Sequence, residues 1–253
     1  MVHSSLLATI LLAPVMLSGR GDLDAAGLAV TAPHGGYDQH TEAIARDLGR
    51  RLGWGWVAAI GYRSEPLRFW YDVNRPTERP WVAGGFRDGR ETAAGRRVFA
   101  EYLGKVGRAA RHGSARLELL VEVHGHARRL QTGHGSVRVE AIELATRGID
   151  RADLWRLKRR YEQLVGDLPS PLRVPLAVDE LDWRYEVDGW EVPFYFRASE
   201  AKQTGSLHRE VTRRALHFEL PPRVRATARA RRAYTGLLAA LLADVARDLG
   251  LTD

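Results

Sequence analysis

Short apolar runs alternate with longer amphipathic stretches along most of this 253-residue chain. Compact runs rich in Val, Leu and Ala are typical of buried strands, whereas apolar residues spaced three or four apart are typical of helices. Strands are predicted over residues 27–30, 56–60 and 117–123, and helices over 41–52, 92–110 and 151–165. This order predicts an α/β fold with three layers: a mixed sheet, helices on both faces, and a site at the strand ends.

The carboxyl-terminal half is expected to continue the same architecture. Residues 137–145 alternate enough to predict another strand, and residues 183–196 predict one or two strands with a turn at Asp188-Gly189. The last helix is predicted over residues 226–249, with one apolar face formed by Leu237, Leu238, Leu241, Leu242 and Val245. The chain is 45% hydrophobic and has no internal repeat, so residues 21–253 are expected to form a single domain.

Histidines follow two of the predicted strands directly. His34 and Asp38 lie on a glycine-rich loop after the first strand, and His124 follows the strand that ends at Val123. Histidine paired with a carboxylate is a ligand set that zinc accepts readily, and a catalytic zinc site keeps three protein ligands. We therefore expect His34, Asp38 and His124 to converge on one zinc ion per chain.

Hydrolysis at such a centre also needs a base and a group that holds the substrate. Glu219 lies within an apolar stretch, where burial is expected to raise its pKa toward that of a useful general base. Asn74 and Arg75 lie side by side, and an arginine side chain is suited to bidentate capture of a carboxylate. The sequence thus offers a candidate base and a candidate anion-binding pair.

Four local sequences resemble the zinc carboxypeptidase-like hydrolases, and within them the N-formylglutamate amidohydrolase and poly-gamma-glutamate hydrolase group. They are Pro33-His34-Gly35-Gly36, Asp72-Val73-Asn74-Arg75-Pro76, Val123-His124-Gly125 and Phe218-Glu219-Leu220. The resemblance spans roughly residues 27–222. It implies a phosphorylase/hydrolase-like fold and zinc held by His34, Asp38 and His124. It also implies a substrate carboxylate bound by Asn74 and Arg75, and Glu219 as the group that activates water for cleavage of an amide in an acidic, glutamate-like substrate.

Some assignments have alternatives within the sequence. Carboxypeptidases place their carboxylate ligand three residues after the first histidine, where this chain has Tyr37, so Glu42 is the alternative to Asp38. Asp38 could instead supply only a favourable charge at the start of the following helix. His126 and His134 are alternatives to His124, or could orient it through its second ring nitrogen.

Charge and cysteine content limit the other function classes. The chain has no cysteine, which excludes a disulfide framework and a thiolate zinc site. Its net charge of +7 could attract nucleic acid, but a nucleic-acid-binding module would leave the histidines and Glu219 without a role. A zinc peptidase or a peptidoglycan-type amidase on the same centre is the nearer alternative. Three further cations expected on the site's face are Arg63, Arg197 and Lys202.

The amino terminus carries an apolar segment over residues 6–17. Its length fits the core of a signal peptide and is too short for a membrane-spanning helix. Residues 1–5 contain no Lys or Arg, however, and Pro14 interrupts the run. Residues 1–20 are therefore a possible signal or amino-terminal segment, and the sequence leaves a cytoplasmic and an exported location equally open.

Overall fold

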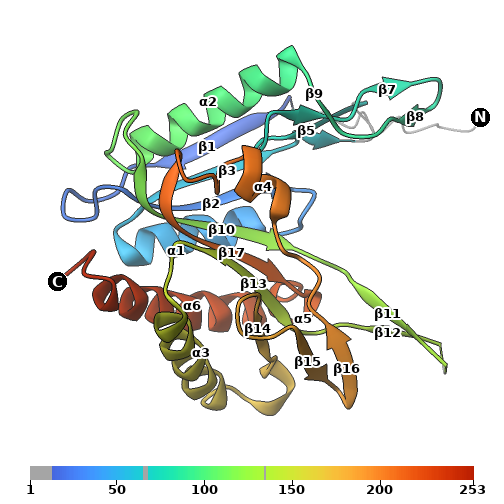
Figure 1. The fold of residues 1–253 in the computed structure, drawn as a ribbon, viewed down its shortest axis with the longest axis vertical. Coiled ribbons are helices and arrows are strands. Elements are labelled where there is room, and N and C mark those ends of the chain that lie inside the picture. The colour runs from blue at the N-terminus through green and yellow to red at the C-terminus, as the bar shows by residue number, and fades with distance from the viewer. Residues whose placement is uncertain (1–12, 65–67, 134) are drawn as a thin grey trace, which may run out of the picture.

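The computed structural model describes residues 13–64, 68–133 and 135–253 (Figure 1). Strands and helices alternate along the chain. Their bounds are β1 (Val15–Gly19), β2 (Leu28–Gly35), α1 (Thr41–Leu52), β3 (Gly55–Ile60), β4 (Arg63–Ser64), β5 (Phe69–Asp72), β6 (Thr77–Glu78), β7 (Trp81–Val82), β8 (Gly85–Phe86), β9 (Arg90–Glu91), α2 (Ala93–Ala109), β10 (Leu117–Gly125), β11 (Arg129–Thr132), β12 (Gly135–Arg138), β13 (Ile142–Arg147), α3 (Arg151–Gly166), the 3-10 turn η1 (Ser170–Leu172), β14 (Leu176–Val178), β15 (Arg184–Val187), β16 (Trp190–Pro193), α4 (Ser199–Thr204), β17 (Thr212–Leu220), α5 (Pro222–Arg225) and α6 (Ala228–Asp248).

Seven strands form the central sheet in the order β1-β3-β2-β10-β17-β13-β14. The four strands β3, β2, β10 and β17 run parallel to their neighbours, whereas β1 and β13 are antiparallel to β3 and β17. The sheet is therefore mixed, as predicted. Because parallel strands end at the same edge, the carboxyl ends of β2, β10 and β17 lie next to one another.

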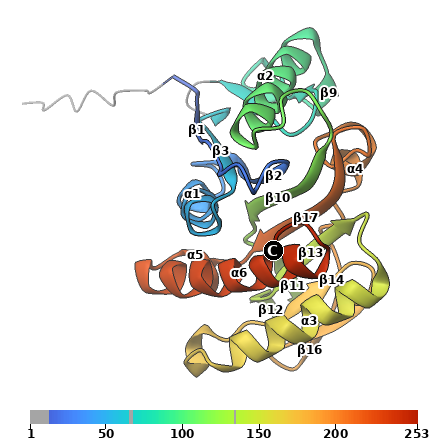
Figure 2. The same cartoon turned by 90° about the vertical axis from the view of Figure 1, so that its left-hand side faces the viewer.

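Helices cover both faces of the sheet (Figure 2). On one face, α1, α3 and α6 bury the larger core, in which Leu48, Leu157 and Leu241 pack against the sheet. On the other face, α2 and α4 contribute Tyr102, Val106 and Ala201 to a second core. The three-layer α/β prediction is confirmed. The strand residues that face α2 and α4 also include polar side chains, and these form the candidate site.

The secondary-structure predictions hold for most elements, with one strand misjudged. Residues 137–145 do not form a single strand: β12 ends at Arg138, and β13 begins at Ile142. β12 pairs with β11 in a separate hairpin, whereas β13 pairs with β17 in the central sheet. The alternating pattern continues through both strands, so periodicity alone does not reveal the break between them. Residues 183–196 contain the two strands β15 and β16, joined at Asp188 and Gly189, which both have positive φ.

Part of the apolar amino-terminal segment belongs to the sheet. Val15–Gly19 forms the edge strand β1, which pairs antiparallel with β3, and Met16 is buried in the second core. Residues 1–12 lie outside the described part of the chain, as does His134. Among the described residues, no helix combines the length and apolar character needed to cross a membrane.

Candidate metal and hydrolytic site

The register of the parallel strands brings the predicted site residues together. β10 and β17 pair so that Glu122 lies opposite His217 and His124 opposite Glu219. Side chains two residues apart in a strand point to the same face, so these four residues share the face covered by α2 and α4. His34 joins them from the end of β2, the neighbouring strand on the other side of β10.

Three potential ligand atoms converge at this edge. The Nδ1 atoms of His34 and His124 lie 3.0 Å apart, and Oδ2 of Asp38 lies 3.3 Å from the first and 3.5 Å from the second. Metal–ligand distances of 2.0–2.2 Å in a tetrahedral zinc site place neighbouring ligand atoms roughly 3.3 Å apart. All three side chains are buried. The spacing therefore suits a small tetrahedral metal ion with one position left open.

Asp38 reaches this point because the loop after β2 turns tightly. The backbone N–H of Asp38 donates to the carbonyl of His34 at 2.8 Å, and Thr41 donates to the carbonyl of Asp38. The Asp38 carboxylate faces the two histidines, and the residue at the start of α1, His40, makes no side-chain cap. Glu42, the alternative ligand, instead accepts a long hydrogen bond from the backbone of Gly36. The structure thus brings Asp38 to the histidines.

A fully buried carboxylate, Glu122, holds the cluster from behind. Its Oε2 lies 3.2 Å from Nε2 of His124, 3.1 Å from Nδ1 of His217 and 3.1 Å from Nδ2 of Asn74. The Oε1 atom accepts from the Ser206 hydroxyl and, at 3.4 Å, from Tyr102. A carboxylate on the second nitrogen of a histidine fixes its orientation and makes it a more basic ligand. The sequence analysis did not assign a role to Glu122, although a glutamate within the apolar run 117–123 is a detectable signal.

The two candidate histidine ligands have opposite pKa shifts. Burial and the nearby charge of Arg63 lower the pKa of His34 to about 4. Burial would also lower the pKa of His124, but hydrogen bonds to Asp38 and Glu122 outweigh it and raise that pKa to about 10. The proton between the two Nδ1 atoms therefore belongs to His124. The cluster has sufficient negative charge to hold a cation at this point.

Glu219 lies beside the cluster and differs from its prediction in one respect. Its Oε1 is 3.3 Å from Nε2 of His217, whose ring stacks on His124 with a centroid distance of 4.1 Å. Burial alone would raise the pKa of Glu219, but the hydrogen bond from His217 and the charge of His124 outweigh it and lower the pKa. The predicted rise was wrong, because the apolar neighbours in sequence do not show the imidazoles in space. Glu219 is an ionised carboxylate at neutral pH.

The predicted anion-binding pair lies at the same cavity but is already engaged. Arg75 donates to Asp72 at 2.8 Å and forms an ion pair with Glu200 of α4. Arg63 also pairs with Asp72, and the two arginines lower the pKa of that carboxyl, against the effect of burial. The Nδ2 of Asn74 is used by Glu122, while its Oδ1 is buried without a partner. Of the other cations expected here, Arg197 lines the cavity and Lys202 pairs with Asp179.

These groups open into a cavity of about 880 Å³. Its wall includes Tyr37, Tyr195, Phe196 and Arg197, beside His34, Asp38 and Glu219. The cavity is large enough for a substrate with several polar groups. A carboxylate base, a candidate metal cluster and several arginines thus face one open space.

Arg225 ties together the three segments that carry the cluster. Its guanidinium donates to the carbonyls of Gln39, His126 and Leu220 at 3.0–3.2 Å. These carbonyls follow Asp38, His124 and Glu219 closely in sequence. Gly125 permits this approach, since a Cβ there would lie 2.7 Å from Nε of Arg225. His126 is thereby part of the support: its own ring lies 2.9 Å from the Ala141 carbonyl, outside the metal cluster.

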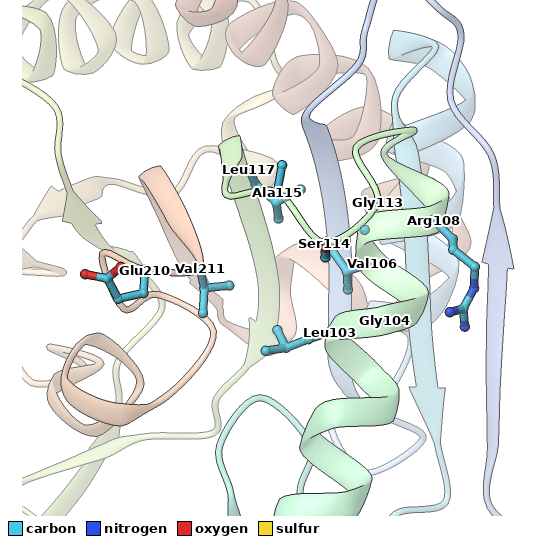
Figure 3. Close-up of a pocket in the computed structure, with 11 residues that line it drawn as sticks. Leu103, Gly104, Val106, Arg108, Gly113, Ser114, Ala115, Leu117, Glu210 and Val211 are labelled. Atoms are coloured by element: carbon cyan, nitrogen blue, oxygen red, sulfur yellow. The ribbon is translucent and has the colours of Figure 1, made fainter.

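A second, smaller pocket lies at the other end of β10 (Figure 3). It has a volume of about 420 Å³ and is lined mainly by apolar residues of α2 and the following loop, with Leu117 at the start of β10. His124 is near the opposite end of the same strand. This pocket contains no histidine and is separate from the candidate site.

No protein-family model matches the chain, and no curated protein matches its sequence. Among solved structures, the fold is similar to a gene product of Agrobacterium tumefaciens, with 15% identity, 93% of this chain and 96% of that chain covered, and a TM-score of 0.49. It is also similar to two chains named "putative metallopeptidase". The chain from Shewanella amazonensis is 14% identical (89% and 79% covered, TM-score 0.40), and that from Shewanella baltica 12% (89% and 78%, 0.39). With identities this low, the reaction must be inferred from the site itself.

Proposed function

We propose that this chain is a zinc-dependent hydrolase that cleaves an amide bond in an acidic, glutamate-like substrate. The observation that carries the proposal is the convergence of two imidazole nitrogens and one carboxylate oxygen within 3.0–3.5 Å of one another at the strand ends. His34, Asp38 and His124 would hold the ion, with the cavity on the open side. The resemblance of the surrounding sequences to amidohydrolases supports the choice of reaction.

The side chains have distinct roles in this reaction. A bound zinc ion supplies a Lewis acid that activates water and polarises the scissile carbonyl. Glu219, ionised and held by His217, takes a proton from the attacking water and delivers it to the leaving nitrogen. Glu122 keeps the ring of His124 in place through its Nε2 atom. The chain thus supplies three ligands, one base and one support for a ligand.

The arginines define the end of the cavity that receives a carboxylate. Arg75 presents a planar fork to the cavity, and Asp72 holds it from below. Arg63 adds a second positive charge and lines the same cavity. Asn74 contributes differently from the prediction that it binds the carboxylate with Arg75: its free Oδ1 is suited to accept an N–H of the substrate.

A panel of amides tests this assignment. N-formylglutamate, gamma-glutamyl amides, ordinary peptides and muropeptides are offered to zinc-loaded protein, and initial rates are compared. We expect turnover of the glutamate-like amides and at least a tenfold lower kcat/KM for analogues in which the carboxylate is replaced by a neutral amide. Preferred cleavage of muropeptides or neutral peptides would move the assignment to an amidase or a peptidase on the same centre.

Exchange of Glu122 for glutamine is expected to weaken zinc binding by roughly 10- to 100-fold, as is usual when the support of a metal ligand is lost. The new amide cannot accept from His124 and His217 with a full negative charge, although it keeps the side chain's shape. The measurement is a competitive titration of zinc with a chromophoric chelator. Glu118→Gln, on the same strand and paired with Arg213, is the matched control and should bind zinc like the wild type. Equal affinity in both variants would remove Glu122 from the zinc site.

Exchange of Glu200 for glutamine is expected to lower KM for an acidic substrate. Glu200 is 70% exposed and pairs with Arg75, so it competes with a substrate carboxylate for the same fork. Exposed ion pairs are worth up to about 1 kcal/mol, which limits the gain to roughly fivefold. The readout is KM for an acidic amide and for its neutral analogue. Glu162→Gln, an exposed residue of α3, should change neither, and a higher KM in Glu200→Gln would mean that Glu200 assists binding.

A further inference from the structure

A row of aromatic rings leads from the cavity onto a projecting arm. Tyr37, on the cavity wall, contacts Trp70, which contacts Phe86, which contacts Trp81. Each pair meets edge to face, with ring centroids 4.8–5.4 Å apart. Trp70, Trp81 and Phe86 belong to β5, β7 and β8, and Figure 1 shows these strands extending away from one end of the central sheet.

Arginine side chains lie along this row. Arg63 stands over Tyr37 and Trp70, with its guanidinium carbon 5.4 and 5.2 Å from the two ring centroids. Arg79 lies 5.3 Å from the centre of Trp70, and Arg68 lies 5.1 Å from that of Trp81. Guanidinium groups held over indole rings are attracted by the ring quadrupole, which fixes their position without neutralising them. The rings therefore present a line of charges.

The far end of this line carries two more exposed arginines, Arg87 and Arg90. They line a hollow of about 520 Å³ together with Pro80, Val82 and Asp88. Arg68, Arg79, Arg87 and Arg90 form no ion pair with any residue that the structure describes. Asp88 is exposed and is the one carboxylate lining this hollow. Positive charge on the arm is thus largely uncompensated by the protein.

We infer that this surface binds an extended acidic peptide-like chain, so that the substrate reaches from the cavity along the arm. The inference rests on the proposed function for the position of the scissile bond. Carboxylates are matched by the planar fork of arginine, and a line of such forks fits a chain with repeated carboxylates. The surface suits nucleic acid less well, because Trp70 is only 7% exposed and the rings contact one another by their edges, leaving few open faces for bases.

Binding of fluorescent oligoglutamate peptides of increasing length tests this inference. Affinity is measured by fluorescence anisotropy for the wild type, for Arg87→Ala/Arg90→Ala, and for the control Arg159→Ala/Arg229→Ala. All four arginines are exposed, and each double variant removes two positive charges, so net charge is matched. We expect affinity to rise with peptide length. The longest peptide should bind roughly tenfold more weakly to the arm variant, and less than about twofold more weakly to the control.

The outcomes separate the surface from general charge and from the reaction. Equal weakening in both double variants, or an affinity independent of length, would overturn the inference. Tighter binding of single-stranded DNA than of the peptide, lost in the arm variant, would also overturn it in favour of nucleic acid. Because binding is measured without turnover, a peptide that binds as expected but is never hydrolysed would count against the proposed function alone.

Discussion

Replacing His124 with alanine is expected to remove zinc from the protein and to lower kcat/KM by at least about a thousandfold. The wild type should contain about one zinc per chain when it is purified without added metal. His124 contributes one of three converging ligand atoms, and its loss leaves His34 and Asp38 alone. A Lewis acid supplies several kcal/mol of transition-state stabilisation, and about 4 kcal/mol corresponds to this loss of rate. Elemental analysis and initial rates give the two readouts.

The controls distinguish loss of a ligand from loss of structure. His112→Ala removes a histidine in the turn after α2, far from the cluster, and should leave zinc content unchanged. Asp38→Asn keeps the shape of the third ligand and weakens its charge, so zinc should be retained less tightly in a folded protein. Thermal unfolding of each zinc-free variant reports on the fold. If the wild type holds no zinc even after zinc is supplied, the ligand assignment fails.

The position of the candidate site was predictable because it depends on strand order. His34 and His124 each follow an apolar strand, and parallel neighbours such as β2 and β10 end at one edge. Asp38 then needs only the tight turn after His34. Glu219 lies on β17, the other neighbour of β10. Local sequence was sufficient here because each residue's location follows from the strand that carries it.

The contacts within the site were not predictable in the same way. Glu122 lies in the middle of an apolar run, and its partners Asn74 and His217 are 48 and 95 residues away. Likewise, the pairing of Arg75 with Glu200 depends on where α4 packs. Such contacts depend on tertiary packing, which no local periodicity encodes. The pKa of Glu219 was predicted in the wrong direction for this reason: its imidazole partner matters more than its apolar neighbours.

The break between β12 and β13 shows a different limit. Both strands have alternating side chains, and the chain passes from one to the other at Val139, Glu140 and Ala141, which are all buried. Their burial continues the apolar pattern across the break. Val139 donates to the carbonyl of Arg128, so the hairpin is closed by a residue outside the predicted strand. Tertiary hydrogen bonds therefore decide where one strand ends and the next begins.

Exchange of Glu219 for glutamine is expected to leave zinc content unchanged and to lower kcat by roughly 100- to 10,000-fold, the usual contribution of a general base. Glutamine keeps the size of the side chain and its contact with His217, but it cannot accept a proton from water. Because Glu219 is outside the group formed by His34, Asp38 and His124, metal binding does not depend on it. The measurement pairs elemental analysis with kcat on a glutamate-like amide.

A matched control separates the base from its neighbourhood. Glu140→Gln changes another buried carboxylate, one that accepts from the backbone of Arg223 and lies outside the described metal clusters. Its kcat should stay within about twofold of the wild type. Unchanged kcat in Glu219→Gln would remove this residue from the reaction and leave His217, the other titratable group on the cavity wall beside it, as the candidate base. Loss of zinc together with loss of kcat would instead make Glu219 part of the metal site, because a residue that acts only on the proton has no reason to affect metal content.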